Sequence, residues 1–339
     1  MEYIVTAYAM DHSMPLLNEA DCHRLTHLNL AFGLVKEGRV SVSHLQQLGR
    51  VADFRKWNPQ LKILLSVGGW GAGGFSEAAA TAAGRALFAH SACEIVQSIG
   101  LDGIDIDWEY PCHGEAGIGW DKADKQNYTL LLQALREALD TVSGERKLLT
   151  VAVGADQYFL DGTEMHKAQG YLDIVQLMTY DMRGGFQVLT GHHTCLFNAT
   201  GDLFRVSTDS SVRLYVDAGV PREKIVIGAA FYGRMWKGVP DVNRGLFQMA
   251  GTTGGHGAHY DELEDAFLSK GYVRYWDEEA KAPWLFNGEN FLSYDDEESI
   301  AHKCAYLKER GLAGIMYWEH GGDKTRRLLN TMHTQLNGA

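Results

Sequence analysis

The 339-residue sequence predicts an α/β protein, a (β/α)8 TIM barrel with a small α+β insertion between its seventh and eighth strands. Apolar, β-branched runs alternate with segments of 3.6-residue periodicity along the whole chain. A doubly wound open sheet is the second interpretation, but no glycine-rich phosphate loop follows any of the runs. The predicted strands are Tyr3–Ala9, Thr26–Gly33, Lys62–Gly69, Leu101–Glu109, Lys147–Gly154, Leu172–Tyr180, Lys224–Tyr232 and Gly314–Trp318.

The segments between these strands carry apolar residues on one helical face. In the third of them, Leu131, Leu135 and Ala138 recur at the spacing of a buried helical stripe. The predicted helices are Ser43–Trp57, Thr81–Ile99, Lys122–Val142, Thr208–Ala218, Glu297–Arg310 and Lys324–Gln335.

The stretch from Gly233 to Leu312 is far longer than one connecting helix requires. Short strand-like runs separated by turns occur within it, at Gly271–Trp276, Ala282–Phe286 and Asn290–Tyr294. We therefore expect one domain over residues 1–339 that contains an α+β insertion at about residues 237–290. The alternative is a long ordered loop.

The composition of the chain excludes several classes of binding partner. A formal charge of −12 argues against nucleic acid and anionic membranes, and no apolar run is long enough to span a bilayer. The five cysteines lack CxxC spacing, so we expect free thiols, no metal site and no cofactor. A monomer is expected. The chain begins directly with a strand-like run, which indicates either a cytoplasmic protein or a secreted one whose signal has been removed.

One predicted strand carries a column of acids. Side chains alternate along a strand, so Asp105, Asp107 and Glu109 share one face with roughly 6.6 Å between neighbours. Two like charges at that separation repel by about 2.5 kcal/mol at an effective dielectric of ~20, so at least one proton should be retained. A protonated carboxyl beside a carboxylate is what general acid catalysis at a glycosidic oxygen requires. A solvated acidic strand is the alternative, and it conflicts with the apolar residues on the opposite face. Asp102 points away from this face, so we assign it a structural role at the start of the strand.

Acids and aromatic residues also occupy the predicted carboxyl ends of the other strands. These ends form the active-site face of such a barrel, and flat aromatic faces next to hydrogen-bonding acids suit sugar rings. The strand-end residues are Tyr8, Ser66, Trp70, Tyr110, Met178, Tyr180, Asp181, Tyr232, Arg234 and Trp318.

The stretch Asp102–Glu109, DGIDIDWE, resembles the DGxDxDxE signature of glycoside hydrolase family 18, the chitinases. The similarity extends to Ser66–Trp70, Met178–Asp181, Tyr232–Arg234 and Trp318, and the insertion resembles that of the family's subfamily A. It implies hydrolysis of β-1,4 bonds in chitin or chitooligosaccharides with retention, assisted by the N-acetyl group of the substrate. The residues alone also allow a conventional pair of carboxylates.

The resemblance implies a role for each catalytic residue. Glu109 would be the acid and base, and Asp107 would orient the acetamide. Tyr180 would bond the acetamide oxygen, and Asp105 would share a proton with Asp107.

The remaining residues would bind substrate. Trp318 would lie under the scissile sugar, with Trp70 and Tyr110 at neighbouring subsites, while Met178, Asp181, Tyr232 and Arg234 would surround the reacting ring. Tyr8 and Ser66 would either bond Asp105 or pack beneath the barrel mouth. Further candidates for the groove are Phe75, Trp120, Phe186 and Trp236.

Two other activities share these features. An endo-β-N-acetylglucosaminidase acting on glycoprotein glycans has the same signature, and a chitooligosaccharide-binding protein without turnover is the rival outside enzymes. The histidine-containing stretches Gly191–Cys195 and Gly254–His259 lack the spacing of metal ligands, so we interpret both as structural loops.

Overall fold

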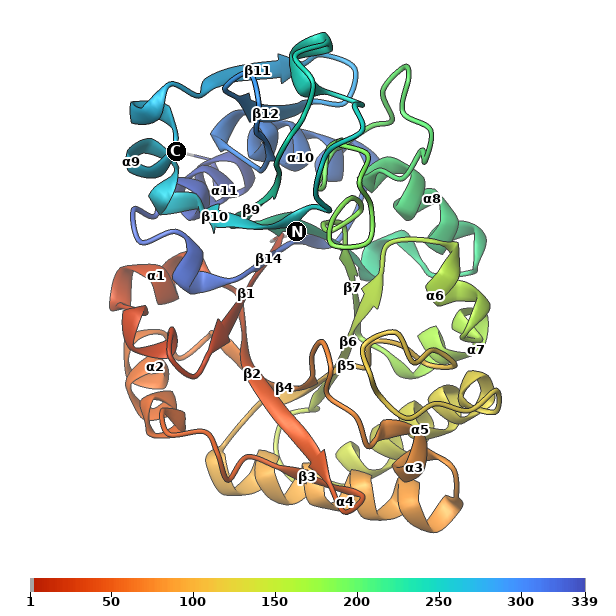
Figure 1. Cartoon of the computed structure of the whole chain (residues 1–339). Coiled ribbons are helices and arrows are strands. Elements are labelled where there is room, and N and C mark those ends of the chain that lie inside the picture. The colour runs from red at the N-terminus through yellow and green to blue at the C-terminus, as the bar shows by residue number, and fades with distance from the viewer. Residues whose placement is uncertain (1–2, 339) are drawn as a thin grey trace.

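The computed structural model describes residues 3–338 and contains the predicted closed barrel (Figure 1). Within these residues, eight parallel strands pair in the order β1-β14-β8-β7-β6-β5-β4-β2, and β1 pairs with β2 to close the ring. Closure excludes the open doubly wound sheet. The strands are β1 (Ile4–Met10), β2 (His27–Lys36), β4 (Lys62–Gly68), β5 (Gly103–Asp107), β6 (Leu148–Gly154), β7 (Ile174–Met178), β8 (Ile225–Ala230) and β14 (Gly314–Trp318).

Helices surround the barrel, and the short strand β3 (Arg39–Ser41) extends β2 as an antiparallel hairpin. The apolar side chains of the strands are almost fully buried. The helices are α1 (Glu19–Arg24), α2 (Val51–Trp57), α3 (Phe75–Ala79), α4 (Ala82–Ile99), α5 (Asp124–Leu139), α6 (Gln157–Asp161), α7 (Met165–Ala168), α8 (Thr208–Asp217), α9 (Leu263–Ala266), α10 (Glu297–Arg310) and α11 (Arg327–Asn337).

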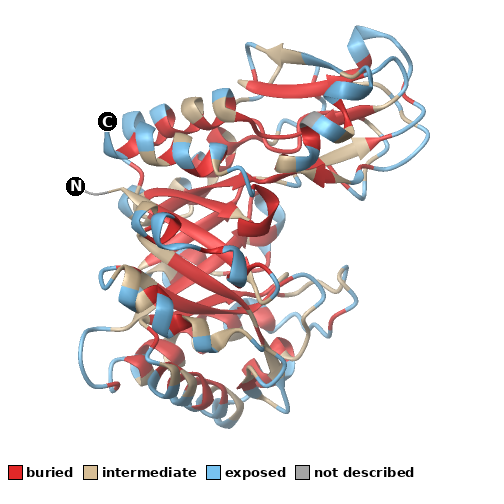
Figure 2. Ribbon diagram, turned by 90° about the vertical axis from the view of Figure 1, so that its left-hand side faces the viewer, coloured by how far each residue is buried: buried red, intermediate tan, exposed pale blue. Residues whose placement is uncertain are grey.

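The insertion between β8 and β14 is present and contains a second, antiparallel sheet ordered β10-β9-β13-β12-β11. Its strands are β9 (Tyr232–Trp236), β10 (Gly255–His259), β11 (Val273–Asp277), β12 (Ala282–Phe286) and β13 (Phe291–Ser293). Trp236, Trp284 and Phe291 build a separate apolar core within it. The sheet projects beyond one side of the barrel (Figure 2). Because β9 and β13 lie outside residues 237–290, we propose that the insertion subdomain includes both of them.

Several predicted elements are shorter than expected, and two of the differences have a clear cause or consequence. The helix predicted over Ser43–Trp57 begins only at Val51, because the carboxylate of Asp11 accepts the backbone N–H groups of Gln46 and Gln47 at 2.9 Å each and holds them in a loop. Strand β5 ends at Asp107, so Glu109 lies in the loop that follows it.

Contacts at the start of β5 agree with the structural role assigned to Asp102. Its carboxylate accepts the backbone N–H of Ile63 at 2.6 Å and is also paired with Arg55. These contacts tie the entry of β5 to β4 and α2.

Among the described residues, no helix is both long and apolar enough to cross a membrane. All five cysteines are free thiols.

Candidate active site

A cavity of about 670 Å³ opens at the carboxyl ends of the barrel strands. Of the predicted catalytic and strand-end residues, all except Asp105 and Ser66 line it, and these two are fully buried. The predicted residues on its wall are Tyr8, Trp70, Asp107, Glu109, Tyr110, Met178, Tyr180, Asp181, Tyr232, Arg234 and Trp318. Parallel strands of equal polarity bring them together although they are far apart in sequence.

Asp105 is fully buried, and four side chains donate to its carboxylate. Tyr8 and Ser66 donate to Oδ2 at 2.9 and 2.7 Å, while Thr150 and Gln176 donate to Oδ1 at 2.6 and 3.0 Å. Burial raises the pKa of Asp105, and these hydrogen bonds oppose the rise. Because the donors occupy the acceptor positions of the carboxylate, a proton shared with Asp107 would have to displace one of them.

Asp107 and Glu109 both hold protons more tightly than ordinary carboxyl groups. Burial raises the pKa of Asp107 well above its usual range, and the charges of Glu109 and Asp105 add to the rise. Burial raises the pKa of Glu109 to about 7; a hydrogen bond with Tyr110 opposes this, and the charge of Asp181 supports it. Asp107 Oδ1 is buried and has no hydrogen-bond partner among the described residues. The site therefore combines a proton donor with a free acceptor.

A close approach of backbone holds this acid column in place. A Cβ atom on Gly68 would lie 1.9 Å from the carbonyl oxygen of Asp107, and Gly68 has a φ of +125°. Only glycine fits there, which explains why this residue type follows Val67 at the end of β4.

The opposite wall carries a charged pair next to the acids. Arg234 on β9 donates to both carboxylate oxygens of Asp181, at 2.7 Å from Nε and 2.5 Å from Nη2. Burial would raise the pKa of Asp181, but hydrogen bonds with His193 and Arg234 outweigh it and hold the pKa below its usual range. Asp181 is therefore a fixed negative charge at the cavity wall.

Aromatic rings form the floor and the mouth of the cavity. Trp318 stacks on Phe32, with ring centroids 5.3 Å apart, and its ring also contacts Tyr8. At the mouth, Trp70 is 55% exposed and lies between Tyr110 and Phe186, with centroid distances of 6.4 and 6.1 Å. Broad, accessible rings of this kind suit the apolar faces of sugars.

Of the further aromatic candidates, only Phe186 reaches the cavity. Phe75 is buried against Trp108, with stacked rings 5.3 Å apart, and Trp236 is fully buried in the core of the insertion. Trp120 is exposed, but it lies outside the cavity. The prediction that Phe75, Trp120 and Trp236 extend the groove is wrong, because loop position alone does not reveal which way a ring packs.

The sequence interpretation missed several residues of the cavity wall. His256 and His259 line it from β10, a strand that was interpreted as a structural loop. His256 and His259 are three positions apart, so the segment gives no period-2 signal that could have indicated this strand, and its pairing with β9 shifts register between His256 and Ala258. Glu115, Asp156, Tyr158 and Phe159 also line the wall and carry no motif, whereas Phe32 and Glu319 lie at the predicted carboxyl ends of the second and eighth strands.

Fold and site together define a glycoside hydrolase type of protein, a barrel that gathers carboxyl groups and aromatic rings at one mouth. The family model described as glycosyl hydrolases family 18 matches residues 5–323. The chain belongs to this family.

Known relatives agree with this assignment. Chitinase A1 of Niallia circulans is 39% identical over 310 residues, covering 85% of this chain and 44% of the relative. Chitotriosidase-1 of Mus musculus is 32% identical, covering 88% of this chain and 67% of the relative. The chain thus spans less than half of the length of chitinase A1.

Among solved structures, a glycoside hydrolase family 18 N-acetylglucosaminidase from Paenibacillus barengoltzii is 58% identical with a TM-score of 0.97. The match covers 98% of this chain and 100% of that one. Chitinase ChiW from Paenibacillus sp. is 35% identical with a TM-score of 0.91, covering 99% of this chain and 33% of that chain.

Proposed function

We propose that this protein hydrolyses β-1,4 bonds between N-acetylglucosamine units in chitin or chitooligosaccharides, with retention of configuration and with Glu109 as acid and base. One observation carries the proposal. Glu109, with a pKa raised to about 7, stands at the cavity wall next to Asp107, whose Oδ1 is buried without a partner among the described residues. A proton donor beside an unused acceptor is what assistance by the N-acetyl group requires.

The chemistry assigns a step to each of these groups. Glu109 gives its proton to the glycosidic oxygen as the bond to the anomeric carbon breaks, and the acetamide oxygen of the same sugar bonds to that carbon. The acetamide N–H donates to Oδ1 of Asp107, and this hydrogen bond holds the group in line and stabilises the oxazolinium ion as it forms. Glu109 then takes a proton from water, the hydroxyl adds to the anomeric carbon, and the ring of the intermediate opens.

The cavity wall supplies the contacts that this pathway needs. In the proposal, Tyr180 bonds the acetamide oxygen, and Trp318 carries the scissile sugar on its face. Trp70 and Tyr110 bind sugars at neighbouring subsites, because their rings line the same cavity. Arg234 and Asp181 flank the reacting ring together with Met178 and Tyr232.

A second candidate is release of single N-acetylglucosamine units from chain ends. It is favoured by the 58% identity, over nearly the full length of both chains, to a structure named as an N-acetylglucosaminidase. The endo-β-N-acetylglucosaminidase and the non-catalytic binding protein remain alternatives. Product analysis on a defined N-acetylglucosamine hexamer with detection of the anomers separates the first two functions, since monomer from the start indicates release of single units. A high-mannose glycopeptide tests the third.

The proposed role of Glu109 is tested with Glu109→Gln. Turnover of a chitotriose reporter should fall by about 10²–10⁴, the loss typical of a missing general acid, while oligosaccharide binding survives. Glu145→Gln is a matched control, because Glu145 is 83% exposed and pairs with Lys62 away from the cavity. Near-normal turnover of Glu109→Gln, or initial products of inverted configuration, would refute the mechanism. Binding without any cleavage by the unmodified protein would favour the binding protein.

A further inference from the structure

A buried histidine lies directly behind the charged wall of the cavity. His193 is fully buried, and its Nδ1 lies 3.5 Å from Asp181 Oδ1 and 3.4 Å from the backbone nitrogen of Asp181. One ring atom thus faces both the carboxylate and the main chain of a single residue. Asp181 has a φ of +54°, a conformation that a non-glycine residue adopts only when its surroundings hold it there.

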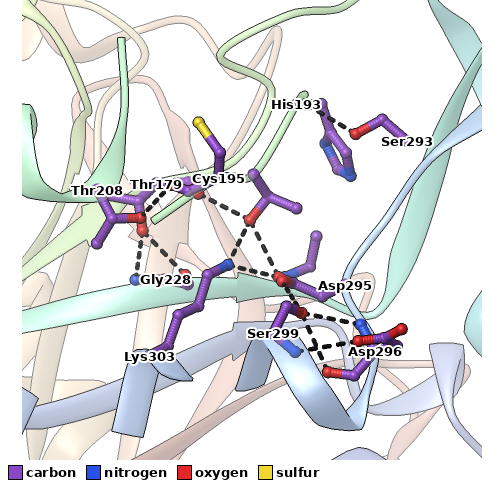
Figure 3. Close-up of polar contacts among 12 residues, drawn as sticks. Thr179, His193, Cys195, Thr208, Gly228, Ser293, Asp295, Asp296, Ser299 and Lys303 are labelled. Atoms are coloured by element: carbon purple, nitrogen blue, oxygen red, sulfur yellow. Dashed lines mark hydrogen bonds and ion pairs between the residues drawn. The ribbon is translucent and has the colours of Figure 1, made fainter. Parts of the chain in front are cut away.

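The surroundings of His193 fix the ring. Its backbone N–H donates to Ser293 Oγ at 2.9 Å (Figure 3). Its carbonyl accepts the N–H of Met182 at 3.1 Å. The ring packs on Tyr232 with centroids 5.2 Å apart. Two backbone hydrogen bonds and the packing of its ring on Tyr232 thus fix His193, so that its ring can restrain the residue in front of it.

A network of buried polar groups continues behind the ring. The hydroxyl of the next residue, Thr194, lies 3.0 Å from the carbonyl oxygen of Thr179 and 3.0 Å from Asp295 Oδ2, and its single proton is shared between these two acceptors. Lys303 donates to both Thr194 and Asp295 at 2.6 Å (Figure 3). The loop that carries His193 is therefore tied to α10 and to the end of β7, immediately before Tyr180 and Asp181.

The ring is best accommodated as a neutral imidazole. Its Nε2 is buried without a hydrogen-bond partner among the described residues, so a second N–H there would have no acceptor. Burial lowers the pKa of His193, and the charge of Asp181 opposes this. At 3.4–3.5 Å the contacts with Asp181 are longer than most hydrogen bonds, so the ring restrains Asp181 by packing as well as by polar attraction.

Charged and titratable groups face Asp181 from several elements. They are Arg234 on β9, His256 on β10, Glu109 after β5, and Tyr180, Tyr232 and His193. The negative charge of Asp181 raises the pKa of Glu109. A displacement of Asp181 would therefore change the pKa of Glu109, the proposed acid.

We propose that His193 is a positioning residue, which fixes the backbone and the carboxylate of Asp181 at the cavity wall in the geometry that the reaction at Glu109 needs. The inference rests on the function proposed above. It assigns a role to a residue that touches neither the substrate nor Glu109.

The test compares His193→Leu with His193→Asn by measuring kcat and KM from pH 4 to 9 on a chitotriose reporter. Leucine removes the polar atom next to Asp181, whereas the asparagine amide places one close to the position of Nδ1. His193→Leu should lower kcat/KM by about tenfold or more, the size of a lost contact to a charged group. It should also move the alkaline limb of the pH profile of kcat/KM to lower pH, because a displaced Asp181 raises the pKa of Glu109 less. His193→Asn should keep most of the kcat/KM of the unmodified protein and most of the position of its alkaline limb.

A double-variant comparison identifies the route of the effect. In an Asp181→Asn background, His193→Leu should cause no further shift of the alkaline limb, because the residue through which it acts has lost its charge. If His193→Leu does not fold, Ser293→Ala replaces it, since it frees the His193 backbone and should shift the limb in the same direction.

An unchanged limb in the folded variant, or the same shift in the Asp181→Asn background, would overturn the inference while hydrolysis by the unmodified protein persists. Failure of the proposed function is a different result, because it would appear as absence of hydrolysis by the unmodified protein.

Discussion

Lys303, on the second turn of α10, is fully buried and offers a direct test of how the barrel supports its active-site wall (Figure 3). Its Nζ lies 2.6 Å from Asp295 Oδ2 and 2.6 Å from Thr194 Oγ1. The substitution Lys303→Met keeps an unbranched side chain of similar length and removes the charge. Asp295, which is also fully buried, then has no cation beside it.

The expected cost follows from what Asp295 retains. Its Oδ2 still accepts from Thr194 and from the backbone N–H of Ala230 at 3.0 Å each, and its Oδ1 accepts from Ser299 at 2.7 Å. Three neutral donors do not replace a cation, so we expect the free energy of unfolding to fall by about 3–5 kcal/mol, as when one partner of a buried pair is removed. An unfolding entropy of about 2.1 cal/mol/K per residue, over 339 residues, converts this into a decrease in Tm of about 4–7 °C.

Thermal unfolding followed by circular dichroism at pH 7 measures this decrease. Asp295→Asn added to Lys303→Met is the matched variant, because its amide oxygen can face Ala230 and Thr194 while its amide nitrogen faces Ser299. Removing both charges should recover part of the lost stability. A decrease of less than about 2 °C in the single variant, or a double variant less stable than the single one, would refute the reasoning.

The other predictions concern the cavity. Because Glu109 must be protonated to act as an acid, and burial raises its pKa to about 7, kcat/KM of the unmodified protein should fall as the pH rises through about 7; a profile flat to pH 9 would contradict this. The raised pKa also means that Glu109 favours folding fully below its unfolded value of 4.5 and loses this contribution as the pH rises through about 7. The glutamine in Glu109→Gln does not titrate. The free energy of unfolding of this variant, relative to that of the unmodified protein, should therefore rise by up to about 3 kcal/mol between pH 4 and pH 8. Chemical denaturation at both pH values measures this difference, and no rise would contradict the prediction. Trp318→Ala should weaken oligosaccharide binding by about 2 kcal/mol or more, measured by calorimetry against Trp120→Ala as a control outside the cavity, and equal affinities of the two variants would remove Trp318 from the binding site.

Much of the architecture was predictable because it rests on local periodicity. Alternating side chains and 3.6-residue stripes identified the eight barrel strands and most helices, and the strand-end rule then placed Trp318, Tyr180 and Glu109 at one mouth. The strand β10 was not predicted, because its glycines and histidines lack period-2 alternation and its pairing with β9 shifts register within the strand.

The sequence by itself therefore determined the barrel, the column of Asp105, Asp107 and Glu109, and the family to which the chain belongs. Only the tertiary structure decided that four donors surround Asp105, that Phe75 faces the core, and that His193 lies behind Asp181. The physical reason is the range of the interactions. Periodicity and motif spacing act between neighbours along the chain, whereas the donors to Asp105 come from residues 39 to 97 positions away, and their convergence depends on how the closed barrel packs.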